Sequence, residues 1–250
     1  MSLVSLERVF AGARALLLDV DDTIVDTRGA MVAAGARAAA ALWPDRPGEH
    51  HAMAQRYYDD PQRWFPRYAS GEVPFERMRA GRLEEVATAF GLGLPAEGHV
   101  AFEEAYAPAF RSAQRLFPDV PQLLSAAARE ELPVGLLTNS AHAPTMVKLE
   151  ALGLVDRFDV VVTTDTLGFG KPDPRVYLEA CRLLGGEPHA VVCIGDSLAW
   201  DVLGAEAAGL RAVWLDREGR GATEEVASVR DLHEVTAALD GRFGSPPSHR

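Results

Sequence analysis

Five short runs of apolar residues, each followed by polar residues, divide the chain into a regular pattern. The strands that these runs predict cover residues 15–20, 133–137, 159–162, 190–194 and 211–215. An apolar run of this length is typical of a strand that is buried on both faces, as in a parallel sheet. Between the later runs, apolar residues recur at helical spacing, so strands and helices alternate. The pattern predicts an α/β fold with a doubly wound, Rossmann-like parallel sheet of about five strands.

The chain between the first two predicted strands is much longer than an ordinary crossover. Residues 29–43 are rich in Ala and helical in pattern, and residues 48–112 carry further helix signals without a convincing strand. We count about four helices, which either pack as extra helices on the sheet or form an inserted domain. The insertion follows directly on an acidic loop, which favours a helical cap over the end of the first strand. We therefore predict a discontinuous core of residues 1–28 and 113–240, an all-helical cap of residues 29–112, and a disordered polar tail of residues 241–250.

Acidic residues follow the first predicted strand at once. Asp19 and Asp21 would project from the strand end, where ligands of open α/β sheets bind. Two like charges this close repel each other, so a cation beside them is expected. Mg²⁺ suits such a place because it takes oxygen ligands and keeps water positions for a phosphate. The structural alternative is a solvated turn, or a helix capped by Asp22 or Thr23.

Polar residues also follow the second and third predicted strands. Thr138 and Asn139 offer a hydroxyl and backbone N–H groups that can bind phosphate oxygens, although the same pair suits a turn or a helix cap. Lys171 follows the third strand and is one of only two lysines in the chain, which favours a binding role over an ordinary surface position. The other lysine, Lys148, lies within a helical pattern and is expected to face solvent.

The fourth predicted strand ends in Gly195-Asp196-Ser197, and Asp201 follows five residues after Asp196. With the Asp-x-Asp-x-Thr pattern, the Thr and the Lys-Pro pair that follow the first three strands, this gives four motifs in a fixed order. In kind and order they resemble the four motifs of the haloacid dehalogenase-like (HAD) hydrolases. The helices that follow the first motif make the chain similar to family phosphatases with an inserted helical cap, of the phosphoglycolate phosphatase type.

The resemblance implies catalytic roles for four residues. Asp19 would be the nucleophile that becomes an aspartyl-phosphate, and Asp21 would be the general acid and base. Thr138 would bind phosphoryl oxygens at the reacting centre. Lys171 would neutralise both the phosphate and the carboxylate of Asp19.

The resemblance also implies a metal site and a phosphate site. Mg²⁺ would be bound by Asp19, by the backbone carbonyl of Asp21, and by Asp196. Asp201 would be a further ligand, or would orient the metal waters or Lys171. Phosphate oxygens would be bound by Asp22, Thr138, Asn139 and Lys171.

Several relatives within the family fit this sequence less well. Family dehalogenases lack an acid at the position of Asp21, and phosphonate-cleaving members use a cap lysine that residues 29–112 do not contain. Sugar-phosphate mutases carry a His early in the cap, and His50 and His51 are not in the expected place. We therefore expect a Mg²⁺-dependent phosphatase that hydrolyses a small phosphomonoester through an aspartyl-phosphate. A non-catalytic phosphate-binding or regulatory module is the alternative from another class, ahead of a haloacid dehalogenase or a mutase.

Composition limits the partners further. The net charge of −11 argues against nucleic acid or an anionic membrane, so a small phosphorylated metabolite is the expected partner. Cys181 and Cys193 lie in apolar surroundings and are expected to be buried free thiols. No membrane span or signal peptide is evident, so a cytoplasmic location is expected. The sequence leaves open the substrate, the oligomeric state, and which of the cap candidates contact substrate: Tyr57, Trp64, Arg67, Tyr68, Arg77, Arg79 and Arg82.

Overall fold

The computed structural model describes residues 5–221 and 225–243. Within them the chain forms two compact units. The first unit comprises the described parts of residues 1–25, 116–142 and 154–250, and it holds the sheet. The second unit comprises residues 26–115 and 143–153, and all its regular elements are helices.

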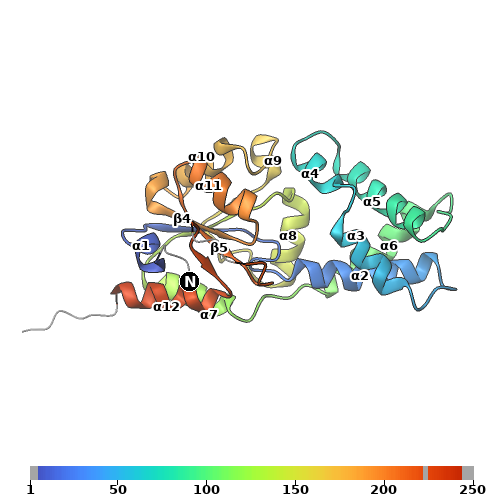
Figure 1. The fold of residues 1–250 in the computed structure, drawn as a ribbon, viewed down its shortest axis with the longest axis horizontal. Coiled ribbons are helices and arrows are strands. Elements are labelled where there is room, and N and C mark those ends of the chain that lie inside the picture. Colours follow the sequence, from blue (N-terminus) through green and yellow to red (C-terminus); the bar gives the residue numbers. More distant parts are fainter. Residues whose placement is uncertain (1–4, 222–224, 244–250) are drawn as a thin grey trace, which may run out of the picture. The chain divides into compact units, whose positions relative to one another are not determined.

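Six parallel strands form the sheet of the first unit, in the order β3-β2-β1-β4-β5-β6 (Figure 1). This is a doubly wound order, and it reverses direction between β1 and β4. The register pairs Leu17 with Cys193 and Leu18 with Ile194, so β4 extends one residue beyond the level at which β1 ends. The predicted α/β fold is thus confirmed. The strands are β1 (Ala15–Leu18), β2 (Val134–Leu137), β3 (Val160–Val162), β4 (Val191–Gly195), β5 (Arg211–Leu215) and β6 (Ser228–Val229).

Helices lie on both sides of the sheet (Figure 1). On one side, α10 (Pro174–Leu183), the π-helix η2 (Leu198–Leu203) and α11 (Gly204–Ala207) pack with alternate strand residues such as Leu17 and Cys193. On the other side, α7 (Val120–Arg129) contacts α12 (Leu232–Phe243), and α1 (Leu6–Phe10) contacts α12 and β5. Two short elements complete this unit, α9 (Thr164–Leu167) and η1 (Pro188–Ala190). Because both faces are covered, β1 and β4 are completely buried, as their apolar sequences require.

Helices α2, α3, α5 and α6 of the second unit pack around a core that is rich in aromatic residues. The ring centroids of Tyr57 and Phe102 are 5.2 Å apart, and those of Phe102 and Tyr106 are 5.4 Å apart. Helix α2 contacts α3 and α6, while α5 contacts α3 and α4. The helices are α2 (Thr27–Leu42), α3 (His50–Asp59), α4 (Trp64–Ala69), α5 (Phe75–Ala89), α6 (Gly98–Ser112) and, from Ala143 on, α8 (His142–Ala151).

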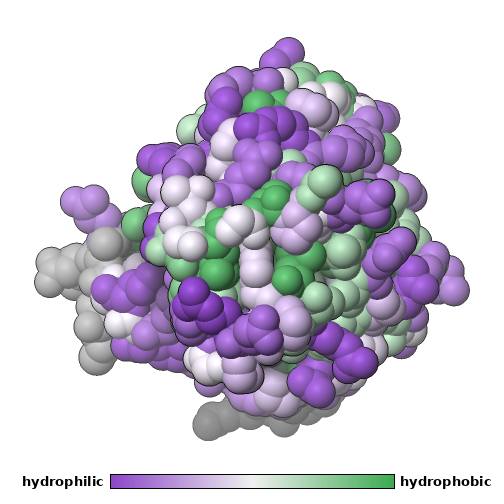
Figure 2. Space-filling model, turned by 90° about the vertical axis from the view of Figure 1, so that its right-hand side faces the viewer, coloured by the Kyte–Doolittle hydropathy of each residue, from purple (hydrophilic) through white to green (hydrophobic). Residues whose placement is uncertain are grey.

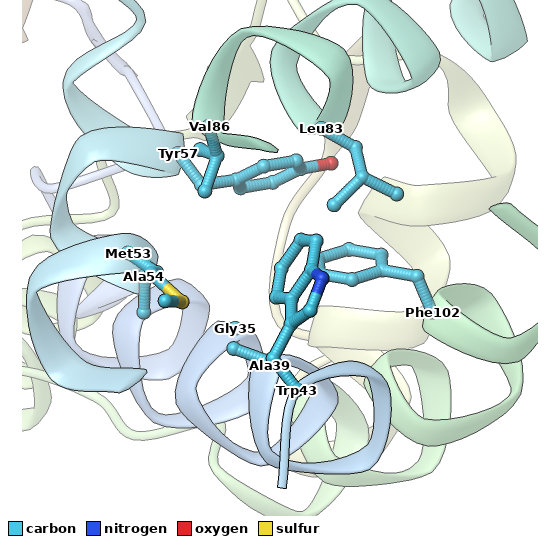
Figure 3. A pocket seen from close by; sticks show the side chains of 9 residues that line it. All are labelled: Gly35, Ala39, Trp43, Met53, Ala54, Tyr57, Leu83, Val86 and Phe102. Carbon is cyan, nitrogen blue, oxygen red and sulfur yellow. The ribbon is translucent and has the colours of Figure 1, made fainter. Parts of the chain in front are cut away.

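A small apolar pocket lies inside the second unit (Figure 3). Helices α2 and α3 approach closely beside it. A Cβ atom at Gly35 would lie only 3.0 Å from the Cβ of Ala54, so glycine at this position permits the approach. The hydroxyl of Tyr57 is buried and has no hydrogen-bond partner in the part of the chain that the structure describes. The pocket is lined by Gly35, Ala39, Trp43, Met53, Ala54, Tyr57, Leu83, Val86 and Phe102.

The surface seen in Figure 2 is largely hydrophilic, and hydrophobic residues are grouped near its centre. None of the helices within residues 5–221 and 225–243 has the length and apolar character needed to cross a membrane.

Three details differ from the sequence-based expectations. The sheet has six strands rather than about five, because β6 adds a two-residue strand beside β5. Five helices, α2 to α6, lie in the segment predicted as the inserted cap instead of about four. The predicted disordered tail begins too early, since α12 continues to Phe243; residues 244–250 lie outside the described residues.

Candidate active site

The chain turns sharply after β1 and holds the acidic residues at the end of this strand. The N–H of Asp19 still donates to the carbonyl of Ile194, at 3.0 Å, as the last bond of the ladder with β4. Asp22 then adopts a left-handed backbone conformation, with φ of 61°. Asp tolerates this conformation better than most residues, so it suits this position of the turn. The N–H of Asp22 closes the turn by donating to the carbonyl of Val25, at 2.8 Å.

Lys171 lies between two carboxylates at the end of the sheet. Its Nζ donates to Oδ1 of Asp19 at 2.7 Å and to Oδ1 of Asp201 at 2.6 Å. All three side chains are buried. Charge-assisted hydrogen bonds of this length are strong in such surroundings. Lys171 thus connects the segments that follow β1, β3 and β4 in one ionic cluster.

Asp201 is fixed by the π-helix that carries it. Its Oδ2 accepts the N–H of Ser197 at 2.9 Å, while its Oδ1 binds Lys171. The hydroxyl of Tyr177, from α10, donates to the carbonyl of Trp200 next to Asp201. Since both carboxylate oxygens are engaged, the geometry favours an orienting role for Asp201 toward Lys171.

The side chain of Asn139 holds the backbone of Lys171. Its Oδ1 accepts the N–H of Lys171 at 2.6 Å, and its Nδ2 donates to the carbonyl of Lys171 at 2.9 Å. A Cβ atom at Gly170 would lie 2.2 Å from Oδ1 of Asn139, so the close approach requires glycine there. Asn139 was predicted to bind phosphate. The structure uses both polar atoms of its side chain elsewhere and leaves only its backbone N–H for that role.

Asp21 is oriented by residues that follow β2. Its Oδ2 accepts the hydroxyl of Ser140 at 3.0 Å and lies 3.5 Å from the hydroxyl of Thr138. Thr138 in turn accepts the N–H of Ser140 at 3.1 Å. Ser140 was not predicted as a site residue. Its position close to Thr138, after the end of a predicted strand, could have indicated it.

Asp196 stands at the end of β4, beside Asp19. Its N–H donates to the hydroxyl oxygen of Thr23 at 3.1 Å, and its carbonyl accepts Nε1 of Trp214 at 2.9 Å. The guanidinium of Arg220 lies 3.5 Å from Oδ2 of Asp196 and also binds its carbonyl. Neither Trp214 nor Arg220 was predicted, because no motif around them points to the site.

The buried charges shift the acidity of the site. Burial raises the pKa of Asp19 to about 7, against the attraction of Lys171. Burial and the charge of Asp19 raise the pKa of Asp196 to about 8. Burial disfavours the charged form of Lys171, but the attraction of Asp19 and Asp201 outweighs it and holds the pKa of Lys171 well above its usual value. The cluster therefore holds more carboxylates than cations and favours a further positive charge.

The donor set suits a hard divalent cation. Carboxylate oxygens of Asp19, Asp196 and Asp201 all lie within 4.8 Å of one another, and they form the candidate metal cluster found among the described residues. Oxygen ligands of this kind are typical of Mg²⁺. Because Asp201 is already committed to Lys171 and Ser197, the side chains best placed to hold a metal are Asp19 and Asp196.

The structure also shows the surroundings of the remaining candidate residues. Lys148 is buried, with 3% of its surface exposed, so the prediction that it faces solvent was wrong. Cys181 and Cys193 are buried free thiols, as predicted. Four arginines that were candidates for substrate contacts are each paired with a carboxylate of the second unit. Their charges are therefore engaged within that unit. The pairs are Arg67–Glu72, Arg77–Glu84, Arg79–Glu103 and Arg82–Asp60.

The chain is similar to known proteins in both sequence and fold. The chain is 38% identical over 134 residues to a phosphoserine phosphatase of Thermus thermophilus, covering 52% of this chain and 54% of that protein. It is 30% identical over 176 residues to the pyrimidine 5′-nucleotidase YjjG of Escherichia coli, covering 69% and 76%. The chain spans about half the length of several curated relatives that it matches, 50–56%.

Solved structures show the same architecture over almost the whole chain. The crystal structure of a HAD phosphatase from Thermococcus onnurineus aligns with a TM-score of 0.62 and 25% identity, covering 91% of this chain and 98% of that one. Several L-2-haloacid dehalogenases align with TM-scores of 0.68–0.71 at 18–24% identity, so the fold alone does not separate the two activities. A model of the haloacid dehalogenase-like hydrolases matches residues 13–209. With this match, its four motifs and its fold, the chain belongs to the haloacid dehalogenase-like hydrolase family.

Proposed function

We propose that this hydrolase is a Mg²⁺-dependent phosphatase that hydrolyses a small phosphomonoester through an aspartyl-phosphate on Asp19. The observation that carries the proposal is the pairing of Asp19 with a second carboxylate, Asp21, on the same loop. The hydroxyl of Ser140 donates to Asp21 at 3.0 Å. An acid at this position is needed to expel an alkoxide, whereas displacement of a halide needs none.

The geometry of Asp19 supports its role as nucleophile. One oxygen, Oδ1, is held by Lys171 at 2.7 Å, and within the described residues no hydrogen bond to Oδ2 is found. One oxygen is thus anchored while the other is available for in-line attack on phosphorus. The positive charge of Lys171 would also offset charge on the phosphoryl oxygens, together with the hydroxyl of Thr138 and the backbone N–H groups of the loop.

The two steps follow from these positions. Asp19 attacks phosphorus, the bond to the leaving oxygen breaks, and Asp21 supplies the proton that this oxygen needs. Asp21, now a carboxylate, removes a proton from water, which attacks the aspartyl-phosphate and releases phosphate and free Asp19. Mg²⁺ bound by Asp19, Asp196 and the backbone carbonyl of Asp21 would supply positive charge for the phosphoryl oxygens.

The comparisons support small phosphorylated metabolites as the substrate class. Relatives bear the names phosphoserine phosphatase, pyrimidine 5′-nucleotidase, phosphoglycolate phosphatase and glyceraldehyde 3-phosphate phosphatase. These substrates are all small phosphomonoesters, but their leaving groups differ widely. We further propose that the second unit acts as the cap that selects among such leaving groups, since it is inserted directly after the loop of Asp19.

An assay with an aryl phosphate, with Mg²⁺ and with a chelator, tests the proposal. We expect turnover that requires the metal, and the Asp19→Asn variant serves as the control for contaminating phosphatases. Halide release from a 2-haloacid without metal would identify a dehalogenase instead. Phosphate binding without any turnover would favour a regulatory module. Among active substrates, a panel of phosphorylated metabolites would then identify the preferred leaving group.

A further inference from the structure

A largely buried ion pair joins Arg217 and Asp119, and Arg217 also binds the loop that carries Asp19. Arg217 follows β5 and Asp119 directly precedes α7. The two terminal nitrogens of the guanidinium donate to the two carboxylate oxygens of Asp119 at 2.8 and 3.0 Å. The side chain of Asp119 is 3% exposed and that of Arg217 is 16% exposed. A forked pair of this kind fixes the plane and direction of the guanidinium.

Asp119 is held firmly on its other side. Its Oδ2 also accepts the N–H of Leu232, at the start of α12, at 2.8 Å. Burial alone would raise the pKa of Asp119, but the hydrogen bonds from Arg217 and Leu232 outweigh it and keep this pKa below its usual value. The carboxylate is therefore charged at neutral pH, and it anchors Arg217 to two helices.

Arg217 also binds the loop that carries Asp19. Its Nη2 also donates to the carbonyl of Thr23 at 2.8 Å. Thr23 is completely buried, and its hydroxyl oxygen accepts the N–H of Asp196 at 3.1 Å. A continuous chain of contacts thus runs from Asp119 through Arg217 and Thr23 to Asp196, which is one of the two best-placed metal carboxylates.

The same guanidinium covers a second connection to this loop. The carbon at its centre lies 3.9 Å from the ring centroid of Phe117. The N–H of Phe117 donates to the carbonyl of Ile24 at 3.1 Å, and Leu116 forms an antiparallel bridge with Val25. Arg217 therefore contacts both the turn that follows Asp19 and the returning segment that is bonded to that turn.

We propose that Arg217, held by Asp119, is a positioning residue of the active site that sets the position of Asp196 through Thr23. The role rests on the proposed function for its effect on turnover, but its effect on metal binding can be measured without any substrate. The hydrogen bonds of Arg217 found among the described residues go to Asp119 and Thr23, so we assign its effect on Asp196 to Thr23 rather than to direct binding.

The test compares Arg217→Met with the wild-type protein and with Arg129→Met as a matched control. Arg129 forms an exposed pair with Asp240, and neither residue takes part in the contacts described for the site. Residues that orient metal ligands typically change affinity or activity by about 10–100-fold when they are replaced. We expect Arg217→Met to weaken Mg²⁺ binding, measured by calorimetry, and to lower kcat by factors in this range, with a smaller change in KM. Arg217→Lys should recover part of the loss, because it restores the charge but not the fork.

Thr23→Val supplies a readout that a purely structural role would not move. It removes the hydroxyl that binds Asp196 but keeps the carbonyl that binds Arg217. If the two residues act in one chain, the double variant should lose little more Mg²⁺ affinity than the more damaging single variant. Additive losses would overturn the proposal. So would a folded Arg217→Met protein with wild-type Mg²⁺ affinity and kcat.

Folding and activity are separated within the same experiment. Thermal unfolding of each variant shows whether it is folded. If Arg217→Met does not fold, the cycle is run with Arg217→Lys, which is judged by the same criteria. If the wild-type protein hydrolyses no phosphomonoester, the proposed function fails, while the calorimetric cycle still decides whether Arg217 positions Asp196.

Discussion

The ammonium nitrogen of Lys171 lies 2.7 Å from Oδ1 of Asp19 inside the protein, where both side chains are almost completely buried. The same nitrogen lies 2.6 Å from Asp201. A buried cation between two carboxylates has a structural as well as a chemical effect. Without it, two negative charges would face each other in a medium that solvates them poorly.

Replacing Lys171 with Met should therefore affect both turnover and stability. Loss of one partner of a buried pair typically costs about 3–5 kcal/mol. We therefore expect the free energy of unfolding of the protein without metal to decrease by this amount. Denaturant unfolding measures it, with Arg182→Met as the control. Arg182 forms an exposed pair with Glu179, and solvent screens such a pair, so its loss should leave the free energy of unfolding nearly unchanged.

Addition of Mg²⁺ should restore part of the stability of Lys171→Met, since a cation then lies beside Asp19 again. Phosphatase turnover should stay low even with Mg²⁺. The variant lacks the ammonium group of Lys171, which we expect to neutralise the phosphoryl oxygens. Unchanged stability together with near wild-type turnover would show that Lys171 is not part of the site.

The sequence predicts the position of Lys171 after a strand but not its burial. The sequence placed it in a loop after a strand, and a loop lysine loses little packing when it is replaced. In the structure its backbone is held by Asn139 and its side chain enters the site. Partners from distant parts of the chain bury a loop residue in this way, and no local pattern encodes them.

Local patterns did predict the elements that carry the site. The apolar runs before Asp19, Thr138 and Asp196 correspond to β1, β2 and β4, because strands buried on both faces must be apolar throughout. The two-residue strand β6 gave no such signal, since it is too short for an apolar run. Ser140, Arg217 and Arg220 were missed for another reason. Their roles depend on contacts with Asp21, Thr23 and Asp196, which only the fold brings near.

Metal affinity should depend on pH through Asp19 and Asp196. Their pKa values are raised to about 7 and about 8, so below these pH values the carboxylates carry protons that a metal must displace. We expect Mg²⁺ affinity to rise from pH 6 to pH 8.5 and binding at pH 7 to release protons. Calorimetry in two buffers of different ionisation enthalpy measures both. An affinity that is equal at the two pH values, with no proton release, would contradict the prediction.

The core of the second unit offers a test of its packing. The hydroxyl of Tyr57 is buried without a partner among residues 5–221 and 225–243, while its ring packs on Phe102 (Figure 3). Tyr57→Phe keeps the ring and removes an unsatisfied polar group, so the free energy of unfolding should stay equal or rise by about 1 kcal/mol. Tyr106→Phe is the matched comparison, because Tyr106 shares a hydrogen bond with Arg79 and should lose stability. A clear loss of stability in Tyr57→Phe would mean that its hydroxyl has a partner.

The different tasks proposed for Asp19 and Asp21 predict two different failures. Asp19→Asn lacks the nucleophile, so no phosphoenzyme should form. Asp21→Asn keeps the nucleophile and should still attack an activated aryl ester, whose leaving group needs no proton. The second step should then stall, because general base catalysis is typically worth about 10²–10⁴-fold.

The most direct measurement is the mass of each intact variant after brief exposure to an activated aryl phosphate with Mg²⁺. We predict an added mass of one phosphoryl group on Asp21→Asn, with a burst of released phenol, and no added mass on Asp19→Asn. A phosphoryl group trapped on Asp19→Asn would place the nucleophile on another residue. Absence of both the burst and the added mass in Asp21→Asn would contradict an aspartyl-phosphate intermediate and favour direct attack by water.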